Sequence, residues 1–176
     1  MECNGKEILR GAKPSRKFSV LRQTKAEVLE ATRRIACVFD DVARVGHPTD
    51  GSPIKIGSLR SDVANAYEKQ TGVKITGNAL YTDAGALLHH RTGIKYARGK
   101  VVPVKDLVEM PSRISGMDVY ENDDALVFTD YYNKYIVEVN QPIRINRTKT
   151  KACCHISSSA VIDKKGFGKY NVIKKK

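Results

Sequence analysis

The chain of 176 residues is strongly basic, with 31 Lys and Arg against 19 Asp and Glu, a net charge of +12 and 41% hydrophobic residues. This length and apolar content suffice for one hydrophobic core and indicate a single domain. No stretch is long and apolar enough to span a membrane, and the charged N-terminus does not resemble a signal peptide. A polyanionic partner, either nucleic acid or an acidic protein, is therefore expected.

The excess positive charge lies at the two ends of the chain. Residues 1–34 hold nine Lys and Arg against four Glu, and residues 141–176 hold ten against one Asp, so the middle is close to neutral. Such ends either contact a polyanion or simply keep the protein in solution.

The four cysteines are Cys3, Cys37, Cys153 and Cys154, and their spacing is not that of a secreted disulfide framework. His155 follows the last pair, but no second ligand pair has zinc-site spacing. We therefore predict no metal site and no cofactor. Reduced thiols favour a cytoplasmic protein, with association with a virion or delivery into a host cell as alternatives.

The N-terminal part of the chain predicts a basic arm followed by a long helix. Residues 1–23 are basic and lack periodicity, as is typical of an arm. Apolar residues then recur at helical spacing from Thr24 to about Arg44, Thr24 and Glu27 fit a capping box, and Gly46 ends the helix.

Shorter elements follow. The sequence predicts a turn-rich connector over Thr49–Gly57, a second helix that begins with Ser58 as its cap and ends at Thr71-Gly72, and a short strand at Val73–Ile75. An apolar run at Val101–Val104 suggests an edge strand, and Lys105–Met110 suggests one or two helical turns before a proline.

From Met117 the hydrophobic period changes from that of a helix to that of a strand. The pattern predicts a hairpin with its turn at residues 121–124, followed by further strands at 134–140, 155–162 and 169–173. We therefore predict an α+β domain over residues 24–173, with N-terminal helices packed on an antiparallel β-meander of four to five strands and a basic tail at 174–176.

The stretch ALLHHRTGIKYAR at residues 86–98 concentrates imidazoles and fixed cations. We expect a short helix capped by Thr82 and ended by Gly93, with His89, His90 and Arg91 at its end. Neighbouring helical residues point about 100° apart, so one histidine would face the core and the other a ligand.

A helical front half, a histidine-bearing helix, the meander sequence ALVFTDYYNKYIVEVN and a Ser-rich last strand together resemble the phage-associated branch of the barnase–EndoU–colicin–RelE superfamily. The resemblance covers roughly Ile54 to Ile173. It implies a metal-independent endoribonuclease of the toxin type, whose RNA-binding cleft lies on the open face of the sheet. It also implies RNA as substrate and a cognate immunity or antitoxin protein, or components of a phage particle, as further partners.

Cleavage of RNA by its own 2′-hydroxyl needs a proton acceptor, a proton donor and cations at the phosphate. Histidine suits both proton transfers, and Arg or Lys suits the phosphate. The predicted catalytic residues are His89, His90, Arg91, His155, Ser157 and Ser158, and the resemblance implies Tyr170 as a further one. The predicted nucleic-acid-binding residues are Lys95, Arg98, Lys151 and Ser159.

Two alternatives to a ribonuclease stay open. A nucleic-acid-binding or virion structural protein without catalysis would explain the charged ends, and the three serines would then form an exposed strand face. A protein that inhibits a partner by occluding a nucleic-acid site is the other alternative.

Overall fold

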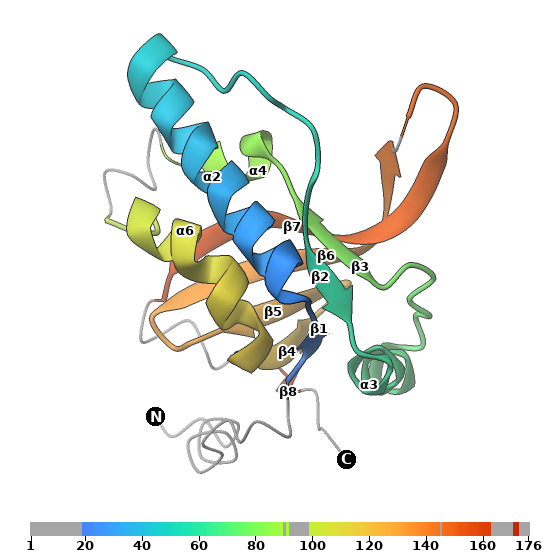
Figure 1. Cartoon of the computed structure of the whole chain (residues 1–176). Coiled ribbons are helices and arrows are strands. Elements are labelled where there is room, and N and C mark those ends of the chain that lie inside the picture. The colour runs from blue at the N-terminus through green and yellow to red at the C-terminus, as the bar shows by residue number, and fades with distance from the viewer. Residues whose placement is uncertain (1–18, 90, 92–98, 145, 163–170, 173–176) are drawn as a thin grey trace.

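The computed structural model describes residues 19–89, 91, 99–144, 146–162 and 171–172, and it shows an α+β fold built on one mostly antiparallel sheet (Figure 1). The eight strands lie in the order β1-β2-β3-β7-β6-β5-β4-β8, and only β3 and β7 run parallel. The strands are β1 (Leu21–Arg22), β2 (Ile54–Leu59), β3 (Ala79–Thr82), β4 (Asp118–Asn122), β5 (Ala125–Thr129), β6 (Asn133–Arg144), β7 (Thr150–Val161) and β8 (Asn171–Val172).

The helices cover one face and one edge of this sheet. They are α2 (Lys25–Val45), α3 (Ser61–Thr71), α4 (Ala84–Leu88) and α6 (Val104–Arg113), with the 3₁₀ turn η2 (Ile114–Gly116) after α6. Figure 1 shows α2 and α6 side by side across the sheet. Among the described residues, no helix is long and apolar enough to cross a membrane.

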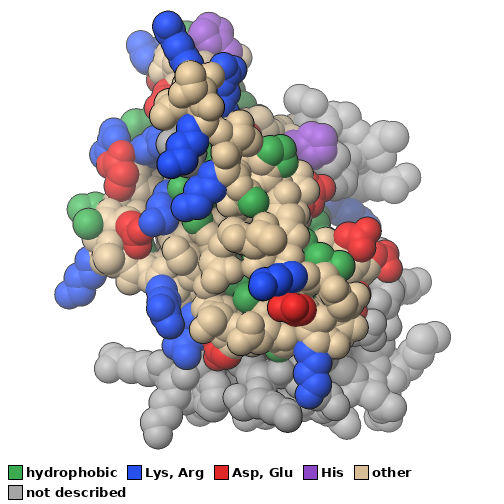
Figure 2. All heavy atoms as spheres, turned by 90° about the vertical axis from the view of Figure 1, so that its right-hand side faces the viewer, with side chains coloured by type: hydrophobic (Ala, Val, Ile, Leu, Met, Phe, Trp, Pro, Cys, Tyr) green, Lys and Arg blue, Asp and Glu red, His purple; other side chains and the backbone are tan. Residues whose placement is uncertain are grey.

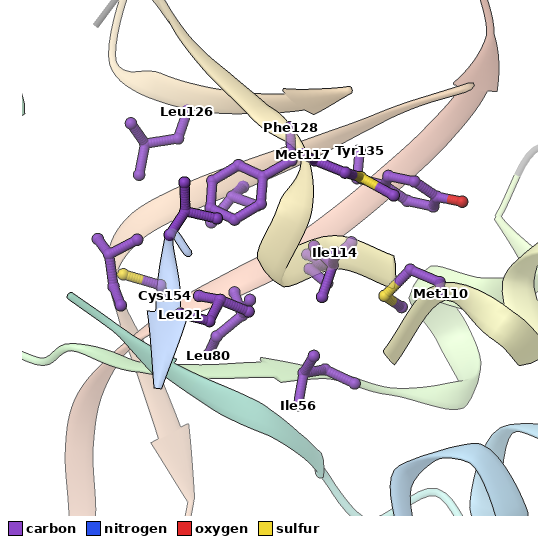
Figure 3. Close-up of a cluster of buried hydrophobic side chains, with 14 of the residues drawn as sticks. Leu21, Ile56, Leu80, Met110, Ile114, Met117, Leu126, Phe128, Tyr135 and Cys154 are labelled. Carbon is purple, nitrogen blue, oxygen red and sulfur yellow. The ribbon is translucent and has the colours of Figure 1, made fainter. Parts of the chain in front are cut away.

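One hydrophobic core lies between these helices and the sheet. Ile35 of α2 and Leu107 of α6 pack in the same buried cluster as Phe128 of β5 and Cys154 of β7. Figure 3 shows how side chains from the strands, η2 and α6 meet in this cluster. Because Cys154 and Ile156 face this core, the residues that alternate with them on β7 face the other side of the sheet.

The long N-terminal helix confirms the sequence prediction in detail. Thr24 is the N-cap of α2, its hydroxyl accepts the Glu27 amide, and the Glu27 carboxylate accepts the Thr24 amide. Gly46 ends the helix with a φ of 84°, a left-handed conformation that glycine adopts without strain.

The capping box predicts a measurable loss of stability. Thr24→Ala removes the side-chain oxygen that satisfies the amide of Glu27, and we expect the free energy of unfolding to fall by about 1 kcal/mol. Urea unfolding measures it, with Thr24→Ser, which keeps the hydroxyl, as the control. Equal stability of the alanine and serine variants would contradict a role for the cap.

The predicted meander is confirmed at the centre of the sheet. Strands β4, β5, β6 and β7 follow one another in sequence, and each pairs antiparallel with the next. The first turn is tighter than predicted, because Asp123 adopts a φ of 52° and lets β4 and β5 connect through two residues.

The prediction of four to five strands is wrong, because β1, β2 and β3 extend the sheet beyond β7. Residues Ile54–Leu59, which were expected to be a connector and a helix cap, form β2, and α3 begins only at Ser61. Val20 and Leu21 are buried and β1 pairs with β2, so the domain begins before Thr24. The parallel pairing of β3 with β7 then makes the sheet mixed.

Four smaller predictions also need correction. No strand forms at Val73–Ile75 or at Val101–Val104 in the described structure, and Val104 instead begins α6 directly after Pro103. The helix α6 continues through Pro111. The cap of α4 is Asp83 and not Thr82, whose side chain is buried and contacts the carbonyl of Ile156.

Candidate functional site

The central feature of the candidate site is a hydrogen bond between Asp83 and His155. The two side chains come from segments 72 residues apart, and the Nε2 atom of His155 lies 2.8 Å from Oδ2 of Asp83. The parallel pairing of β3 with β7 places Tyr81 beside His155, so the chain leaves β3 with Asp83 diagonally across from the imidazole. Both side chains are partly exposed, which leaves them open to a ligand.

A second hydrogen bond holds the Asp83 carboxylate in place. Its Oδ1 atom accepts the amide of Ala86 at 2.8 Å and thereby caps α4, while Oδ2 faces His155. The hydrogen bond from His155 is the largest influence on the carboxyl group, and it lowers the pKa of Asp83 below its usual value. The carboxylate is therefore ionised at neutral pH, and its hydrogen bond with Nε2 orients the imidazole.

This pair opens into a pocket of about 260 Å³ on the sheet. The pocket is bordered by Arg144 and Gln141 from the end of β6, and its walls include Pro53, Pro142 and Ile143. Arg144 borders the pocket and its guanidinium donates to the carbonyl of Arg147 at 3.1 Å. A guanidinium can bind two oxygens of a phosphate at once.

A second carboxylate lies next to His155 on the neighbouring strand. Glu138 of β6 is the cross-strand partner of His155, and its side chain is exposed. Directly opposed residues in an antiparallel pair share a face, with Cβ atoms about 4.5–5.5 Å apart. Glu138 therefore lies on the same face of the sheet as His155, although it lines a different pocket, and Asp83 is the carboxylate that is hydrogen-bonded to the imidazole.

The structure separates the histidine–arginine cluster that the sequence pointed to. Helix α4 ends at Leu88, and His89 is its exposed C-cap. Arg91 turns inward, where it donates to the carbonyl of Val102 at 2.7 Å and lies 5.2 Å from the centre of the Phe39 ring. His90, Lys95, Arg98 and Tyr170 lie outside the described residues.

The other predicted site residues lie along β7. His155 borders the pocket, whereas Ser157, Ser158 and Ser159 are partly buried further along the strand and do not. Ser159 is paired with Tyr135, and Ser158 with Ile136. Lys151 is exposed on the hairpin that joins β6 to β7. Of the seven predicted catalytic residues, the described structure therefore brings only His155 into the pocket.

Three residues of the candidate site were not predicted from the sequence: Asp83, Glu138 and Arg144. Only for Asp83 did the sequence contain a local signal. Asp83 stands at the N-terminus of a short predicted helix, where a carboxylate is a common cap. Its pairing with His155 depends on the parallel contact of β3 with β7, and that contact connects segments with no local sequence relation. Glu138 and Arg144 follow only from the register of β6 against β7.

The lowered pKa of Asp83 predicts a specific response to acid. A carboxyl group whose pKa is lower in the folded state stabilises the protein above its unfolded pKa, near 3.9, and this contribution is lost as the pH falls through the folded pKa. Asp83→Asn keeps a cap for α4 but removes the titrating group. We therefore expect wild type to lose more stability than the variant between pH 5 and pH 3.

Urea unfolding of both proteins at several pH values in this range measures the difference. Asp62→Asn, which changes an exposed carboxylate on α3, is the matched control and should not alter the acid response in the same way. Parallel loss of stability in wild type and Asp83→Asn would contradict the hydrogen bond between Asp83 and His155 as the cause of the lowered pKa.

Within the described residues, no group of three or more His, Cys, Asp or Glu side chains is arranged to hold a metal ion.

Comparison with known proteins finds no relative of this chain. No protein-family model, no curated protein and no solved structure matches the chain.

Proposed function

We propose that the protein is a metal-independent endoribonuclease that cleaves RNA through attack by the 2′-hydroxyl. The observation that carries the proposal is the 2.8 Å contact between His155 and Asp83 in a pocket that Arg144 also borders. The three groups supply a titratable proton carrier, a carboxylate that fixes it, and a cation for a phosphate.

Each group has a distinct role in the proposed reaction. One proton must leave the 2′-hydroxyl as its oxygen attacks phosphorus, and another must reach the departing 5′-oxygen. His155 and Glu138 are the two groups for these transfers, since they lie opposite each other on adjoining strands. Asp83 orients His155, and Arg144 neutralises the charge that develops on the phosphate oxygens.

Membership in the barnase–EndoU–colicin–RelE superfamily is part of the same proposal. The support is an antiparallel meander with helices on one face, together with a candidate site formed on strands. A toxin-like enzyme of this kind would act in a cytoplasm on cellular RNA and would need a cognate immunity protein in the cell that makes it.

A comparison of RNA with DNA tests the proposed reaction. The full-length protein is incubated in EDTA with an oligoribonucleotide and with the deoxyribonucleotide of the same sequence. We expect the RNA to be cut and the DNA to stay intact, because the DNA lacks the attacking hydroxyl. Intact RNA at micromolar protein, or equal cleavage of both, would overturn the proposal.

A second candidate function is nucleic-acid binding without cleavage, for example in a phage virion. The hairpin between β6 and β7 favours it, since residues 139–162 contain four Lys and Arg and no Asp or Glu. Binding would then weaken steeply with salt, and RNA would be recovered unchanged. Turnover of RNA in the preceding experiment would exclude this candidate.

A further inference from the structure

The hairpin that joins β6 to β7 extends well beyond the sheet. We call its outer part, residues 141–144 and 146–153, the basic arm. Figure 1 shows it projecting at the upper right, away from the helices, and Figure 2 shows Lys and Arg side chains gathered over the upper part of the face seen from that side. Arg147, Lys149 and Lys151 of the arm are exposed, and none of them forms an ion pair with a carboxylate among the described residues.

The strand geometry aligns the arm with the candidate site. From Thr150 to Cys153, β7 pairs residue for residue with β6. Between Cys153 and His155 the register shifts, and the extra residue belongs to β6, so the alternation along β7 is not interrupted. Because side chains alternate along a strand, Lys151, Cys153 and His155 share one face. Ile143, the partner of Lys151, borders the same pocket as His155. At about 3.3 Å per residue, Lys151 lies about 13 Å from His155, and Lys149 lies farther out.

The arm is fixed at its base by the segment that precedes β3. Asn140, at a φ of 54°, accepts the amide of Thr76 at 2.8 Å and donates to the carbonyl of Lys74 at 2.8 Å. Gly77 lies so close to the arm that a Cβ atom there would be 1.9 Å from the carbonyl oxygen of Ala152. Only glycine fits this contact, so the base of the arm has a set position relative to the pocket.

The tip of the arm is also held by internal hydrogen bonds. Asn146 accepts the amides of Thr148 and Lys149, and Arg144 donates to the carbonyl of Arg147 at 3.1 Å. A preformed row of cations costs less ordering entropy on binding than a flexible tail would.

We propose that the basic arm binds the backbone of single-stranded RNA beyond the phosphate that is cut, so that the enzyme cleaves polymers more efficiently than dinucleotides. This inference rests on the proposed ribonuclease function. A dinucleotide has one phosphate, which the pocket takes, and it cannot reach Lys151. A single row of cations matches one backbone, whereas a duplex presents two. The arm therefore adds affinity only for a substrate that continues past the pocket.

The test separates binding from cleavage. Binding of a ten-nucleotide single-stranded RNA is measured against salt in the His155→Gln background, with and without the arm changes Arg147→Gln, Lys149→Gln and Lys151→Gln. Three lost contacts should make the slope of log K against log salt shallower by about 2. The control variant carries Arg22→Gln, Lys25→Gln and Lys69→Gln, which remove the same number of positive charges from β1, α2 and α3. Its slope of log K against log salt should equal that of the protein with an intact arm.

Cleavage is then compared on the ten-nucleotide RNA and on a dinucleotide, with His155 present. We expect the arm variant to lower kcat/KM for the longer RNA at least tenfold and to leave cleavage of the dinucleotide unchanged. An unchanged salt slope, or an equal loss on both substrates, would overturn the role of the arm. If binding depends on the arm but wild type cuts no RNA, the ribonuclease proposal fails and the arm assignment stands. Arm-dependent binding of duplex RNA alone would overturn the single-strand assignment.

Discussion

Replacing His155 with Gln is expected to slow RNA cleavage about 10²- to 10⁴-fold while leaving the fold and RNA binding intact. Gln retains a polar group beside Asp83 but cannot carry a proton between the attacking and departing oxygens. Cleavage rates of a labelled RNA in EDTA measure the loss, and the unfolding midpoint checks the fold. His47→Gln is the matched control, because His47 is exposed in the loop after α2 and away from the pocket.

The same assay compares the two histidine sites that sequence and structure suggest. A double variant, His89→Gln with His90→Gln, removes the pair that the sequence pointed to, and we expect it to retain most activity if His155 is the proton carrier. Loss of cleavage in the double variant with full activity in His155→Gln would place the chemistry at the end of α4 and contradict the Asp83–His155 assignment.

Phe128→Ala is expected to lower the free energy of unfolding by about 3–5 kcal/mol. The Phe128 side chain is 0% exposed and packs at the centre of the core between the sheet and the helices (Figure 3), so its loss removes buried apolar surface and leaves a cavity. Since small domains are stable by only about 5–15 kcal/mol, this variant would lose a large part of its stability.

Urea unfolding measures the effect, with Leu29→Ala as the control. Leu29 is 72% exposed on the outer side of α2, so its truncation should change stability by less than about 0.5 kcal/mol. Similar losses in the two variants would mean that the core does not lie between α2, α6 and the sheet.

The elements that could be predicted from the sequence are those with a strong local pattern. The capping box and Gly46 delimit α2 within a residue or two, and the alternating sequence from Val119 to Val139 gives three strands of the meander. In both cases the residues that decide the structure are close in sequence, so periodicity and caps suffice.

The elements that could not be predicted depend on contacts between distant segments. β2 is short and lies between turn residues and a helix, and its pairing with β3 follows from the sheet and not from its own composition. The candidate site has the same origin, since Asp83 and His155 meet only where β3 and β7 run parallel. The sequence identified His155 as one of several histidines, but its partner and its pocket required the three-dimensional arrangement.

The most direct test of the proposed chemistry is mass spectrometry of the products that wild type and His155→Gln form from one oligoribonucleotide in EDTA. Attack by the 2′-hydroxyl leaves a 2′,3′-cyclic phosphate on one fragment and a free 5′-hydroxyl on the other. We expect wild type to produce these ends and His155→Gln to produce almost none. Intact RNA with wild type, or the same products at the same rate from the variant, would contradict a ribonuclease centred on Asp83 and His155.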